Sequence, residues 1–381
     1  MSELLREEEV SLLLERISSA KTRLDLAYQE HASNHVTMAM RHLRSLEFNL
    51  MLRPSGQDSY RSQHCENAQF FYQRGVKGYC ILSSTGGYIE GVSHFEPRFN
   101  NPLQTIPRKK RLKGNYIFLG DGHHSNMWHT CIVVLRNLAQ INRNNSSERQ
   151  WLFRRNPKIL TYSTAWEWSR FLLSLLDLRV APIDPYTLYT VENLLVPCET
   201  DLRTDSHHES FDRISADYSQ SNSAITRYSS LRQVRLTVRA RIEDFPTPKS
   251  HLYNKIYVSR RRAGRPLLNE LELERRLMAN GFTIVFLEDY EPSRQLEIFA
   301  SAKVIVSPHG AGLCNMIACA DECIIVEIYN PSMNRRTYLA MANEVELGNF
   351  MRFPSSPAEG KSHVISIEHF MTFLDSLSLP A

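Results

Sequence analysis

The sequence SAKVIVSPHGAGLCNMIACADECIIVEIYNP, residues 301–331, decides the fold of this chain. Its pattern predicts a buried strand at 304–306 and a second buried strand at 324–328. Between them it predicts a tight turn, HGAG at 309–312, and a short helix from about Leu313. Apolar runs of this length between turn residues favour strands of a parallel sheet that is covered on both faces. The stretch therefore indicates an α/β domain.

The turn between the first strand and the helix has the composition of an anion site. Gly310 and Gly312 let the backbone approach a ligand closely. The unpaired N–H groups of a helix's first turn, here Gly310, Ala311, Gly312 and Leu313, favour a negative charge. His309 can add a hydrogen-bond donor or a charge. We predict a phosphate or diphosphate site here, and the alternative is a sharp connection with a packed histidine.

Composition sets the class of protein and the compartment. The chain has 381 residues, enough for two ordinary domains, and 42% hydrophobic residues, which is typical of globular proteins. Its net charge of +4 is too small to indicate nucleic-acid binding. The odd number of cysteines, seven, favours a reducing compartment. The chain begins without a signal-peptide pattern and has no apolar run long enough to span a bilayer, so we expect a cytoplasmic protein with at most a peripheral contact to the inner face of the cell membrane.

Periodicity and composition divide the chain into four segments. Residues 1–53 predict an amphipathic helical extension, which either packs on its own domain or joins copies into a homo-oligomer. Residues 54–200 predict an α/β domain, 201–230 a polar linker or loop, and 231–381 a Rossmann-like α/β domain. The strands expected are at 78–82, 87–92, 116–119, 158–162, near 180, 190–196, 255–259 and 282–286, in addition to the two above. The helices expected are at 127–137, 171–176, 224–243, 269–280 and 293–302.

Two polar stretches of the first α/β domain need a functional and a structural interpretation. The basic run from Arg108 to Lys113 is interpreted as a solvated loop, or as a contact with anionic lipid or an acidic acceptor. The glycine-punctuated loop with Asp121, His123 and His124, together with His129, precedes and enters a helix, a common place for catalytic groups. Its spacing does not match the usual zinc patterns.

Further charged residues follow strands of the second α/β domain. Because ligands bind at the carboxyl ends of parallel strands, these residues are expected to converge on one edge of the sheet. Arg260 and Arg265 can clamp a diphosphate with paired N–H donors. Glu327 can accept hydrogen bonds from a ribose, and the alternative for it is an ion pair with Arg335 or Arg336. The sequence thus predicts a ligand with two phosphates and a sugar.

Several motifs together resemble the C-terminal signature of glycosyltransferase family 61. They are YVSRRRAGRPLLNE at 257–270, Gly281-Phe282, Gln295, SAKVIVSPHGAGLCN at 301–315 and IIVEIYNP at 324–331. Asn126-Met127-Trp128-His129 is more weakly similar to the family's Asn-Tyr-Tyr-His element. The sequence departs from the family at Val133, where an acidic residue is usual, and at Cys314, where threonine is common.

The resemblance implies a fold and an activity. It implies a GT-B-like architecture of two Rossmann-like domains facing a cleft, with the acceptor on the N-terminal side. It implies inverting transfer of a sugar, hexosyl or pentosyl, from a nucleotide sugar, here expected to be UDP-linked, to a hydroxyl of a glycan acceptor. It also implies a role in surface or capsular polysaccharide synthesis, with no metal and no cofactor besides the nucleotide-sugar co-substrate.

The resemblance also implies roles for individual residues. Asn315 and Glu327 are expected as ribose or donor contacts. From the chemistry of the residues, Asp121 is favoured as the catalytic base over His123, His124 and His129, since a carboxylate in a half-desolvated cleft can be tuned towards neutral pH. Val133 leaves a non-catalytic module that binds nucleotide sugars or carbohydrate as the main alternative. A metal-dependent hydrolase built on the aspartate and histidine cluster is a weaker one.

Overall fold

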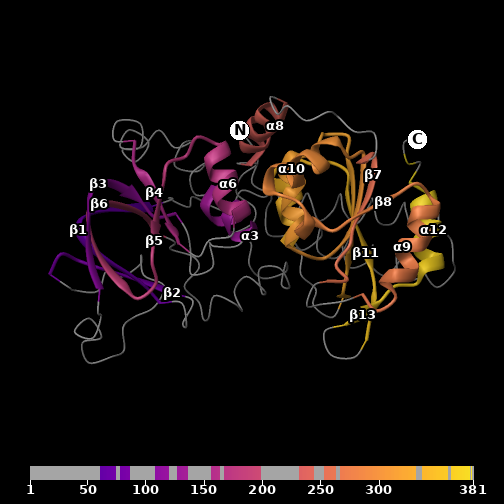
Figure 1. Cartoon of the computed structure of the whole chain (residues 1–381), viewed down its shortest axis with the longest axis horizontal. Helices are drawn as coiled ribbons and strands as arrows, with labels where there is room; N and C mark the ends of the chain where they lie inside the picture. Colours follow the sequence, from indigo (N-terminus) through magenta and orange to yellow (C-terminus); the bar gives the residue numbers. More distant parts are fainter. Residues whose placement is uncertain are drawn as a thin grey trace, which may run out of the picture. The chain divides into compact units, whose positions relative to one another are not determined.

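The computed structural model describes two compact units of the chain, one within residues 58–203 and one within residues 204–381 (Figure 1). The residues described are 61–73, 78–85, 108–119, 127–135, 156–163, 167–198, 231–243, 253–262, 267–331, 337–358, 362–377 and 379. The predicted helical extension at 1–53 and the predicted linker at 201–230 lie entirely outside the described residues. The mixed α/β architecture with parallel strands agrees with the predicted fold class at that coarser level.

The N-terminal unit is built on a six-stranded mixed sheet of order β2-β1-β6-β3-β4-β5. Strands β6, β3, β4 and β5 run parallel, whereas β1 is antiparallel to both β6 and β2. The strands are β1 (Arg61–Gln73), β2 (Gly78–Leu82), β3 (Arg108–Ile117), β4 (Lys158–Tyr162), β5 (Val180–Ile183) and β6 (Thr187–Cys198). The helices are α3 (Met127–His129), which continues as a π-helical turn at Thr130–Leu135, and α6 (Glu167–Leu175).

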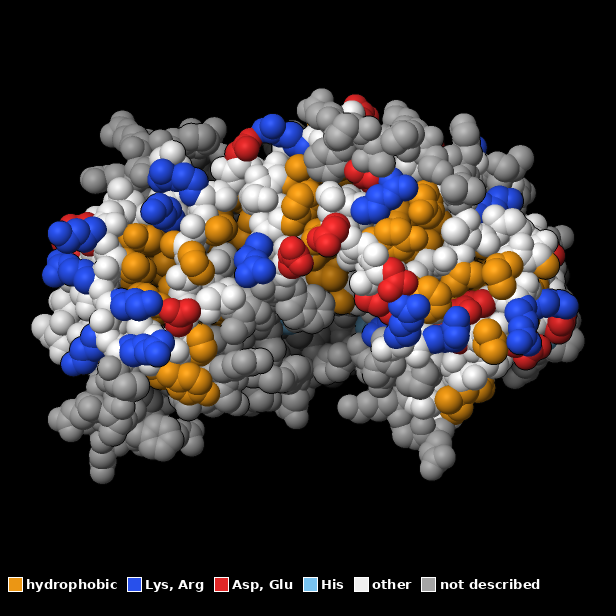
Figure 2. Space-filling view, in the orientation of Figure 1, with side chains coloured by type: hydrophobic (Ala, Val, Ile, Leu, Met, Phe, Trp, Pro, Cys, Tyr) orange, Lys and Arg blue, Asp and Glu red, His pale blue; other side chains and the backbone are white. Residues whose placement is uncertain are grey.

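The interpretation of the basic run in this unit as a loop was wrong. The basic run from Arg108 to Lys113 is the first part of β3 and not a loop. Backbone pairing with β6 begins at Arg108 opposite Thr187, so tertiary pairing overrides the low strand propensity of a run of cations. The charged side chains stay exposed, and Figure 2 shows Lys and Arg side chains over this unit, at the left of the view. The strand expected at 87–92 lies outside the described residues.

The C-terminal unit is built on a five-stranded sheet whose strands all run parallel, in the order β8-β7-β9-β10-β11. The strands are β7 (Lys255–Val258), β8 (Thr283–Val285), β9 (Val304–Pro308), β10 (Ile324–Tyr329) and β11 (Phe350–Pro354). A small hairpin, β12 (Ser356–Pro357) and β13 (His363–Val364), follows. The predicted alternation of strands and helices in this part of the chain is confirmed.

Helices cover both faces of this sheet. Helices α9 (Glu270–Ala279) and α12 (Ile367–Asp375) lie on one face, and α10 (Pro292–Ser301) lies on the other (Figure 1). The other helices are α8 (Leu231–Glu243), the 3-10 helices η4 (Leu287–Asp289) and η5 (Ala311–Ala318), and α11 (Thr337–Glu344). Within the part of the chain that the structure describes, no helix combines the length and hydrophobicity that a transmembrane span requires.

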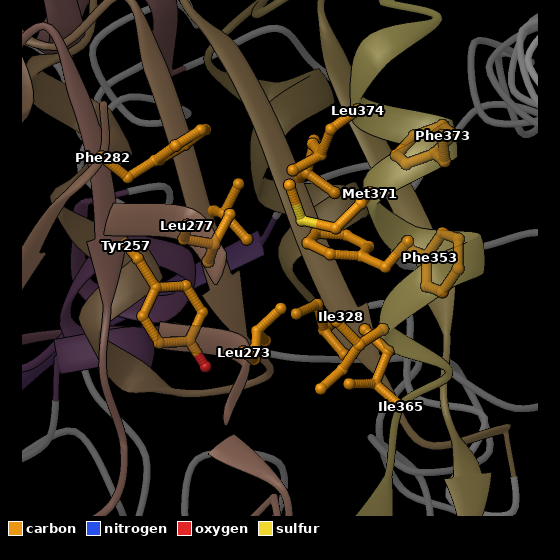
Figure 3. Close-up of a cluster of buried hydrophobic side chains, with 14 of the residues drawn as sticks. Tyr257, Leu273, Leu277, Phe282, Ile328, Phe353, Ile365, Met371, Phe373 and Leu374 are labelled. Atoms are coloured by element: carbon orange, nitrogen blue, oxygen red, sulfur yellow. The ribbon is translucent and has the colours of Figure 1, made fainter. Parts of the chain in front are cut away.

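The core of the C-terminal unit lies between the sheet and helices α9 and α12. Phe353 of β11 packs edge-on against Phe370 of α12, with 4.9 Å between ring centroids. Leu273 and Leu277 of α9 are fully buried against Tyr257 of β7 in the same cluster (Figure 3). Each such side chain contributes about 1.5–3 kcal/mol by burial, so this face fixes the strands whose ends carry the site.

The end of α9 shows how the sequence positions these strands. Gly281 adopts a left-handed conformation with φ of +80°, as predicted for a glycine C-cap. The amide of Phe282 then donates to the carbonyl of Leu277 at 3.0 Å. The chain thereby turns directly from α9 into β8.

Candidate functional site

The strand order of the C-terminal unit places a topological switch point between β7 and β9, and in open α/β sheets a crevice forms at such a point. The chain moves from β7 to β8 on one side and then to β9 on the other, so the connections leave β7 and β9 in opposite directions. In open α/β sheets, ligands bind at this switch point, outside the carboxyl ends of the strands. Arg260 follows β7 and His309 follows β9, and Tyr257 pairs with Val306 in register. The predicted convergence of these two segments is therefore confirmed by the topology.

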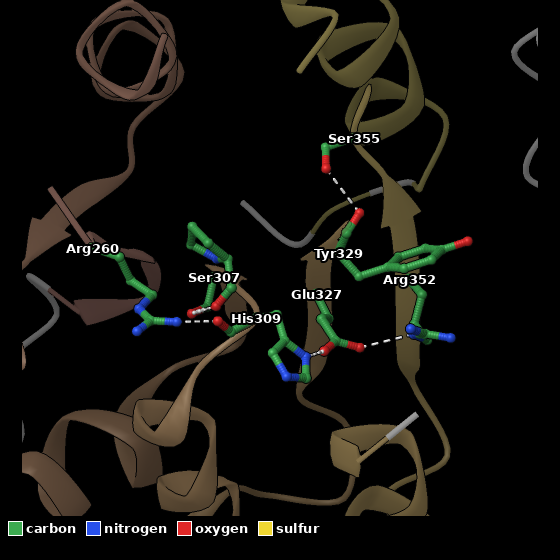
Figure 4. Close-up of polar contacts among 8 residues, drawn as sticks. Arg260, Ser307, His309, Glu327, Tyr329, Arg352 and Ser355 are labelled. Atoms are coloured by element: carbon green, nitrogen blue, oxygen red, sulfur yellow. Dashed lines mark hydrogen bonds and ion pairs between the residues drawn. The ribbon is translucent and has the colours of Figure 1, made fainter. Parts of the chain in front are cut away.

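Arg260 spans the switch point. Its guanidinium Nη1 donates a hydrogen bond to the backbone carbonyl of His309 (Figure 4). A Cβ atom at Gly310 would lie 2.6 Å from the guanidinium carbon Cζ of Arg260. Gly310 has an extended backbone, so the lack of a side chain is needed for space and not for a left-handed conformation. Arg265, the second predicted arginine, lies outside the described residues.

The two glycines of the turn have different neighbours. A Cβ atom at Gly312 would lie 2.6 Å from Cδ1 of Leu287, in the segment after β8, so this glycine permits close packing of two connections. The amide of Leu313 donates to the carbonyl of Gly310 at 3.0 Å, and the Leu313 side chain is fully buried. The turn already uses the Leu313 amide, and a contact between this amide and a ligand stays a prediction. The amides at the very start of η5, those of Ala311 and Gly312, are the donors that a helix start leaves for an anion.

A buried carboxylate holds the ring of His309. Nδ1 of His309 lies 2.6 Å from Oε1 of Glu327, and Nε of Arg352 donates to Oε2 of Glu327 at 2.9 Å (Figure 4). The His309 ring also packs on Tyr338, with 4.9 Å between centroids. A carboxylate accepts and does not donate, so Nδ1 carries the proton and Nε2 is the nitrogen left for a ligand. The His309 side chain is 15% exposed, which leaves its ring at the surface of the crevice.

Glu327 is ionised despite its burial. Burial by itself raises its pKa, but the charge of Arg352 and the hydrogen bond from His309 outweigh burial and hold the pKa below the ordinary value of 4.5. Its side chain is 0% exposed, and each of its oxygens already accepts a hydrogen bond from the protein. A direct contact with a ribose stays a prediction. Its ion-pair partner is Arg352, on the neighbouring strand β11, and Arg335 and Arg336 lie outside the described residues.

A second buried carboxyl group, which the sequence interpretation missed, holds Arg260. Oε1 of Glu270 accepts the backbone amide of Arg260 at 2.6 Å and the hydroxyl of Tyr257 at 2.9 Å. Burial raises the pKa of Glu270, and the nearby charge of Glu274 adds to this, while the two neutral donors only partly offset it. The signal in the sequence was the Asn-Glu pair that ends the YVSRRRAGRPLLNE motif, at the start of α9.

Two buried amides tie the turn to the neighbouring connection. Nδ2 of Asn315 donates to the carbonyl of Gly312 at 3.0 Å and lies 3.4 Å from Oε1 of Gln295. Nε2 of Gln295 donates to the carbonyls of Leu287 and Tyr290, both at 3.0 Å. Asn315 is fully buried and braces the turn through these hydrogen bonds, and its contact with the donor stays a prediction. The sequence alone could not distinguish an amide that braces the turn from an amide that contacts the donor.

The predicted base cluster lies in the N-terminal unit. Asp121 and His123 lie outside the described residues, together with His124. His129 is the last residue of α3, is partly buried, and packs edge-on against Trp128 with 4.8 Å between ring centroids. The helix then continues as a π-helical turn that includes Val133, and such turns are frequent at functional sites.

The cysteines near the switch point are structural. Cys314, Cys319 and Cys323 are buried free thiols, and burial raises the pKa of Cys319 well above its ordinary value. Among the described residues, no three His, Cys, Asp or Glu side chains are grouped so as to hold a metal ion. Buried thiols of this kind act as small apolar groups of the core and not as reactive nucleophiles.

Comparison with known proteins adds a family to this geometry. A family model described as Glycosyltransferase 61 matches residues 101–326, more than half of the chain. The match includes His129, Arg260 and the turn from His309 to Gly312, and it ends one residue before Glu327. Comparison with curated proteins gave no match. The resemblance found in the sequence is thereby confirmed.

Proposed function

The chain belongs to glycosyltransferase family 61, and from this premise we propose that it transfers a sugar, with inversion, from a nucleoside-diphosphate donor to a hydroxyl group of a glycan acceptor. The observation that carries the proposal is the position of the Arg260 guanidinium, which lies over Gly310 at the switch point between β7 and β9. A cation at the carboxyl edge of a parallel sheet, next to a helix start, is suited to a diphosphate.

In the proposed donor site, five groups bind the diphosphate. Arg260 supplies a delocalised charge with several donors, which matches phosphate oxygens better than lysine does. Nε2 of His309 donates to a phosphate oxygen when the ring is protonated. The amides of Ala311 and Gly312 add two uncharged donors at the positive end of η5. Arg265, seven residues after Val258 at the end of β7, is proposed as a second cation from the sequence motif alone.

The proposed reaction breaks one bond and forms one bond at the anomeric carbon. A base removes the proton of the acceptor hydroxyl, and the oxygen forms a bond to the anomeric carbon from the face opposite the diphosphate. The bond from that carbon to the phosphate oxygen breaks, and its electron pair leaves with the nucleoside diphosphate. Arg260, His309 and the two amides stabilise the negative charge that develops on the leaving group. Attack from the opposite face gives inversion.

The base is proposed from the sequence. Asp121 is the favoured candidate, with His123 and His129 as alternatives, because a carboxylate in a partly desolvated site can reach a pKa suited to proton transfer. A UDP-linked donor, a hexosyl or pentosyl group and a role in surface or capsular polysaccharide synthesis complete the proposal. Each of these follows from the family resemblance and awaits its own measurement.

The second candidate is a non-catalytic module of the same fold. It is favoured by Val133, which replaces the carboxylate that the family usually has four residues after the histidine of the Asn-Tyr-Tyr-His element. Such a module would bind a nucleotide sugar through the same crevice and transfer nothing. Donor binding therefore does not separate the two candidates, and product formation does.

The donor site is tested by thermal unfolding with a panel of nucleoside diphosphates and nucleotide sugars. A ligand present at about 100 times its Kd stabilises the folded state by about 2.7 kcal/mol, which raises the Tm measurably. The wild type should respond to one nucleoside diphosphate, and Arg260→Ala should lose that response. Arg262→Ala is the matched control, because Arg262 is exposed, pairs with Asp289 and packs on Phe286. A wild type that responds to none of the ligands would overturn the proposed donor site.

A further inference from the structure

The first part of β3 is a cluster of cations on an ordered strand. Arg108, Lys109, Lys110, Arg111 and Lys113 are all exposed, and only the half-buried Leu112 interrupts them. A strand rises about 3.3 Å per residue, so these five charges span roughly 16 Å. Pairing with β6 keeps them in a fixed row, which a solvated loop would not do.

Three of these cations have no counter-charge among the described residues. Lys110 forms an ion pair with Asp184 at 3.0 Å, and Arg111 donates to Oδ1 of Asn67 at 3.1 Å. Within the described part of the chain, Arg108, Lys109 and Lys113 make no such contact. The strand therefore carries an excess of positive charge that is available to a partner.

The geometry of β3 allows its cationic side chains to extend past the same edge of the strand and so to contact one flat surface. β6 pairs along β3 from Arg108 onwards, whereas β4 joins the other side only at Tyr116 and Ile117. Among the described strands, residues 108–115 thus have no partner on the side towards β4. Consecutive side chains point to opposite faces of a strand, and long cationic side chains from both faces can extend past such an edge.

An exposed aromatic residue lies beside the cations. Tyr186 is 47% exposed, precedes Thr187, the pairing partner of Arg108, and has a φ of 58°. About half of this tyrosine is accessible to solvent, in a turn next to the cations. Tyrosine is enriched at the headgroup level of membranes, where its ring is partly dehydrated and its hydroxyl stays in water.

We propose that Arg108, Lys109, Lys113 and Tyr186 form a docking surface for an anionic lipid bilayer. A bilayer offers a plane of negative charge that requires no matching pocket, and a row of cations at a strand edge with an adjacent tyrosine is complementary to it. Each cation near such a surface strengthens binding about fivefold, so three contribute about a hundredfold, and salt weakens the attraction. The surface lies in the N-terminal unit and does not depend on the proposed donor site.

Cosedimentation with vesicles tests the proposal. The full chain is mixed with vesicles of phosphatidylcholine and with vesicles that also contain phosphatidylglycerol, at low and high salt. The wild type should bind only the anionic vesicles, and less at high salt. The triple variant Arg108→Gln, Lys109→Gln, Lys113→Gln should lose about a hundredfold in affinity. Tyr186→Asn, which tolerates the positive φ, should lose a smaller factor.

A matched control removes the same net charge elsewhere. Arg170, Lys303 and Arg275 are exposed and lie outside this surface, so their simultaneous replacement by Gln should leave vesicle binding within a few-fold of the wild type. Equal losses in both triple variants would mean that only net charge matters and would overturn the proposal.

The alternative role for these cations is to protect an open strand edge from aggregation. Light scattering without lipid measures that role separately. A wild type that ignores anionic vesicles, or that binds a soluble polyanion such as heparin but no vesicle, would overturn the proposal. If the triple variant aggregates, the salt dependence of the wild type and the loss in Tyr186→Asn decide the outcome.

Discussion

Two buried carboxyl groups hold the two sides of the crevice, and their surroundings shift their pKa values in opposite directions. Glu327, at the end of β10, holds the ring of His309, and its pKa is lowered. Glu270, at the start of α9, holds the backbone of Arg260, and its pKa is raised. Both side chains are almost inaccessible to water, so burial does not explain the difference.

The difference comes from the charge of the hydrogen-bond donors. Glu327 accepts from the guanidinium of Arg352 and from His309, whereas Glu270 accepts from an amide and from the hydroxyl of Tyr257. At Glu327 the cation outweighs the cost of burying an ionised carboxylate, whereas the neutral donors at Glu270 offset that cost only in part. The His309 side of the site is thus fixed by charge, and the Arg260 side by neutral hydrogen bonds.

The largest effect on stability should come from removing Arg352, the cation that pairs with Glu327. Arg352→Met leaves Glu327 buried with His309 as its only partner, and we expect the free energy of unfolding to fall by about 3–5 kcal/mol, as when one partner of a buried ion pair is lost. Urea unfolding at neutral pH measures it. In Arg276→Met, which breaks the exposed pair with Glu368, the loss should stay below about 1 kcal/mol.

A double variant shows whether the loss is due to the uncompensated charge. Adding Glu327→Gln to Arg352→Met removes the buried negative charge, so stability should partly recover. No recovery would mean that Arg352 acts mainly by packing, through its contact with the Tyr329 ring at 3.8 Å, and the comparison of the two carboxyl groups would fail.

The next effect is on the orientation of His309. Glu327→Gln keeps the size of the side chain but offers one acceptor oxygen in place of two, so either His309 or Arg352 loses its bond. We expect a loss of roughly 2 kcal/mol in stability, together with weaker binding of the nucleoside diphosphate. Calorimetric titration measures the affinity. Unchanged affinity would show that the ring of His309 does not need Glu327 to meet the ligand.

The two sides also differ in how far sequence could predict them. Arg260 and the HGAG turn each follow a predicted strand of one parallel sheet. The hydrophobic pattern of the sequence and the rule that ligands bind at the carboxyl ends of such strands were therefore enough to place them together. The partner of Glu327 was not predictable, because Arg352 meets it only through the register of β10 with β11. Asn315 carries no mark in the sequence that distinguishes a bracing amide from a ligand contact.

The N-terminal unit was less predictable for a related reason. A run of cations has neither the alternation of a half-buried strand nor the apolar character of a buried one, so nothing local marks the residues from Arg108 to Lys113 as a strand. Pairing with β6, which is distant in sequence, decides it. The antiparallel pairing of β1 with β6 and with β2 is a further feature that the predicted Rossmann-like domain lacks, although the strand at 78–82 itself was predicted.

A smaller effect separates the two glycines of the turn. Gly310→Ala pushes the flexible guanidinium of Arg260 aside, so affinity for the nucleoside diphosphate should fall about tenfold, the value of one charge-assisted hydrogen bond, with little change in stability. Gly312→Ala instead presses on Leu287, so stability should fall by about 1–3 kcal/mol. Calorimetric titration measures the affinity of both variants, and urea unfolding measures their stability. If Gly310 served only packing, Gly310→Ala would lose stability and keep its affinity for the nucleoside diphosphate.

The smallest effect concerns Glu270, and its sign is opposite to that expected for Glu327. The folded state raises the pKa of Glu270 above its ordinary value of 4.5, so the folded protein binds a proton more tightly than the unfolded chain does. This carboxyl group therefore costs stability at neutral pH, and the cost disappears as pH falls through the raised pKa towards 4.5. Glu327, with its lowered pKa, stabilises the fold above 4.5 and loses that contribution below it.

Glu270→Gln tests this sign. The amide keeps an acceptor for the Arg260 backbone and the Tyr257 hydroxyl and cannot ionise, so the variant should equal or exceed the wild type in stability at neutral pH by up to about 1 kcal/mol. The advantage should shrink as pH is lowered towards 4.5, measured by urea unfolding at a series of pH values. A variant that is less stable at neutral pH and gains as pH falls would show that Glu270 is ionised and paired, as Glu327 is. The contrast between the two sides of the crevice would then rest on packing and not on charge.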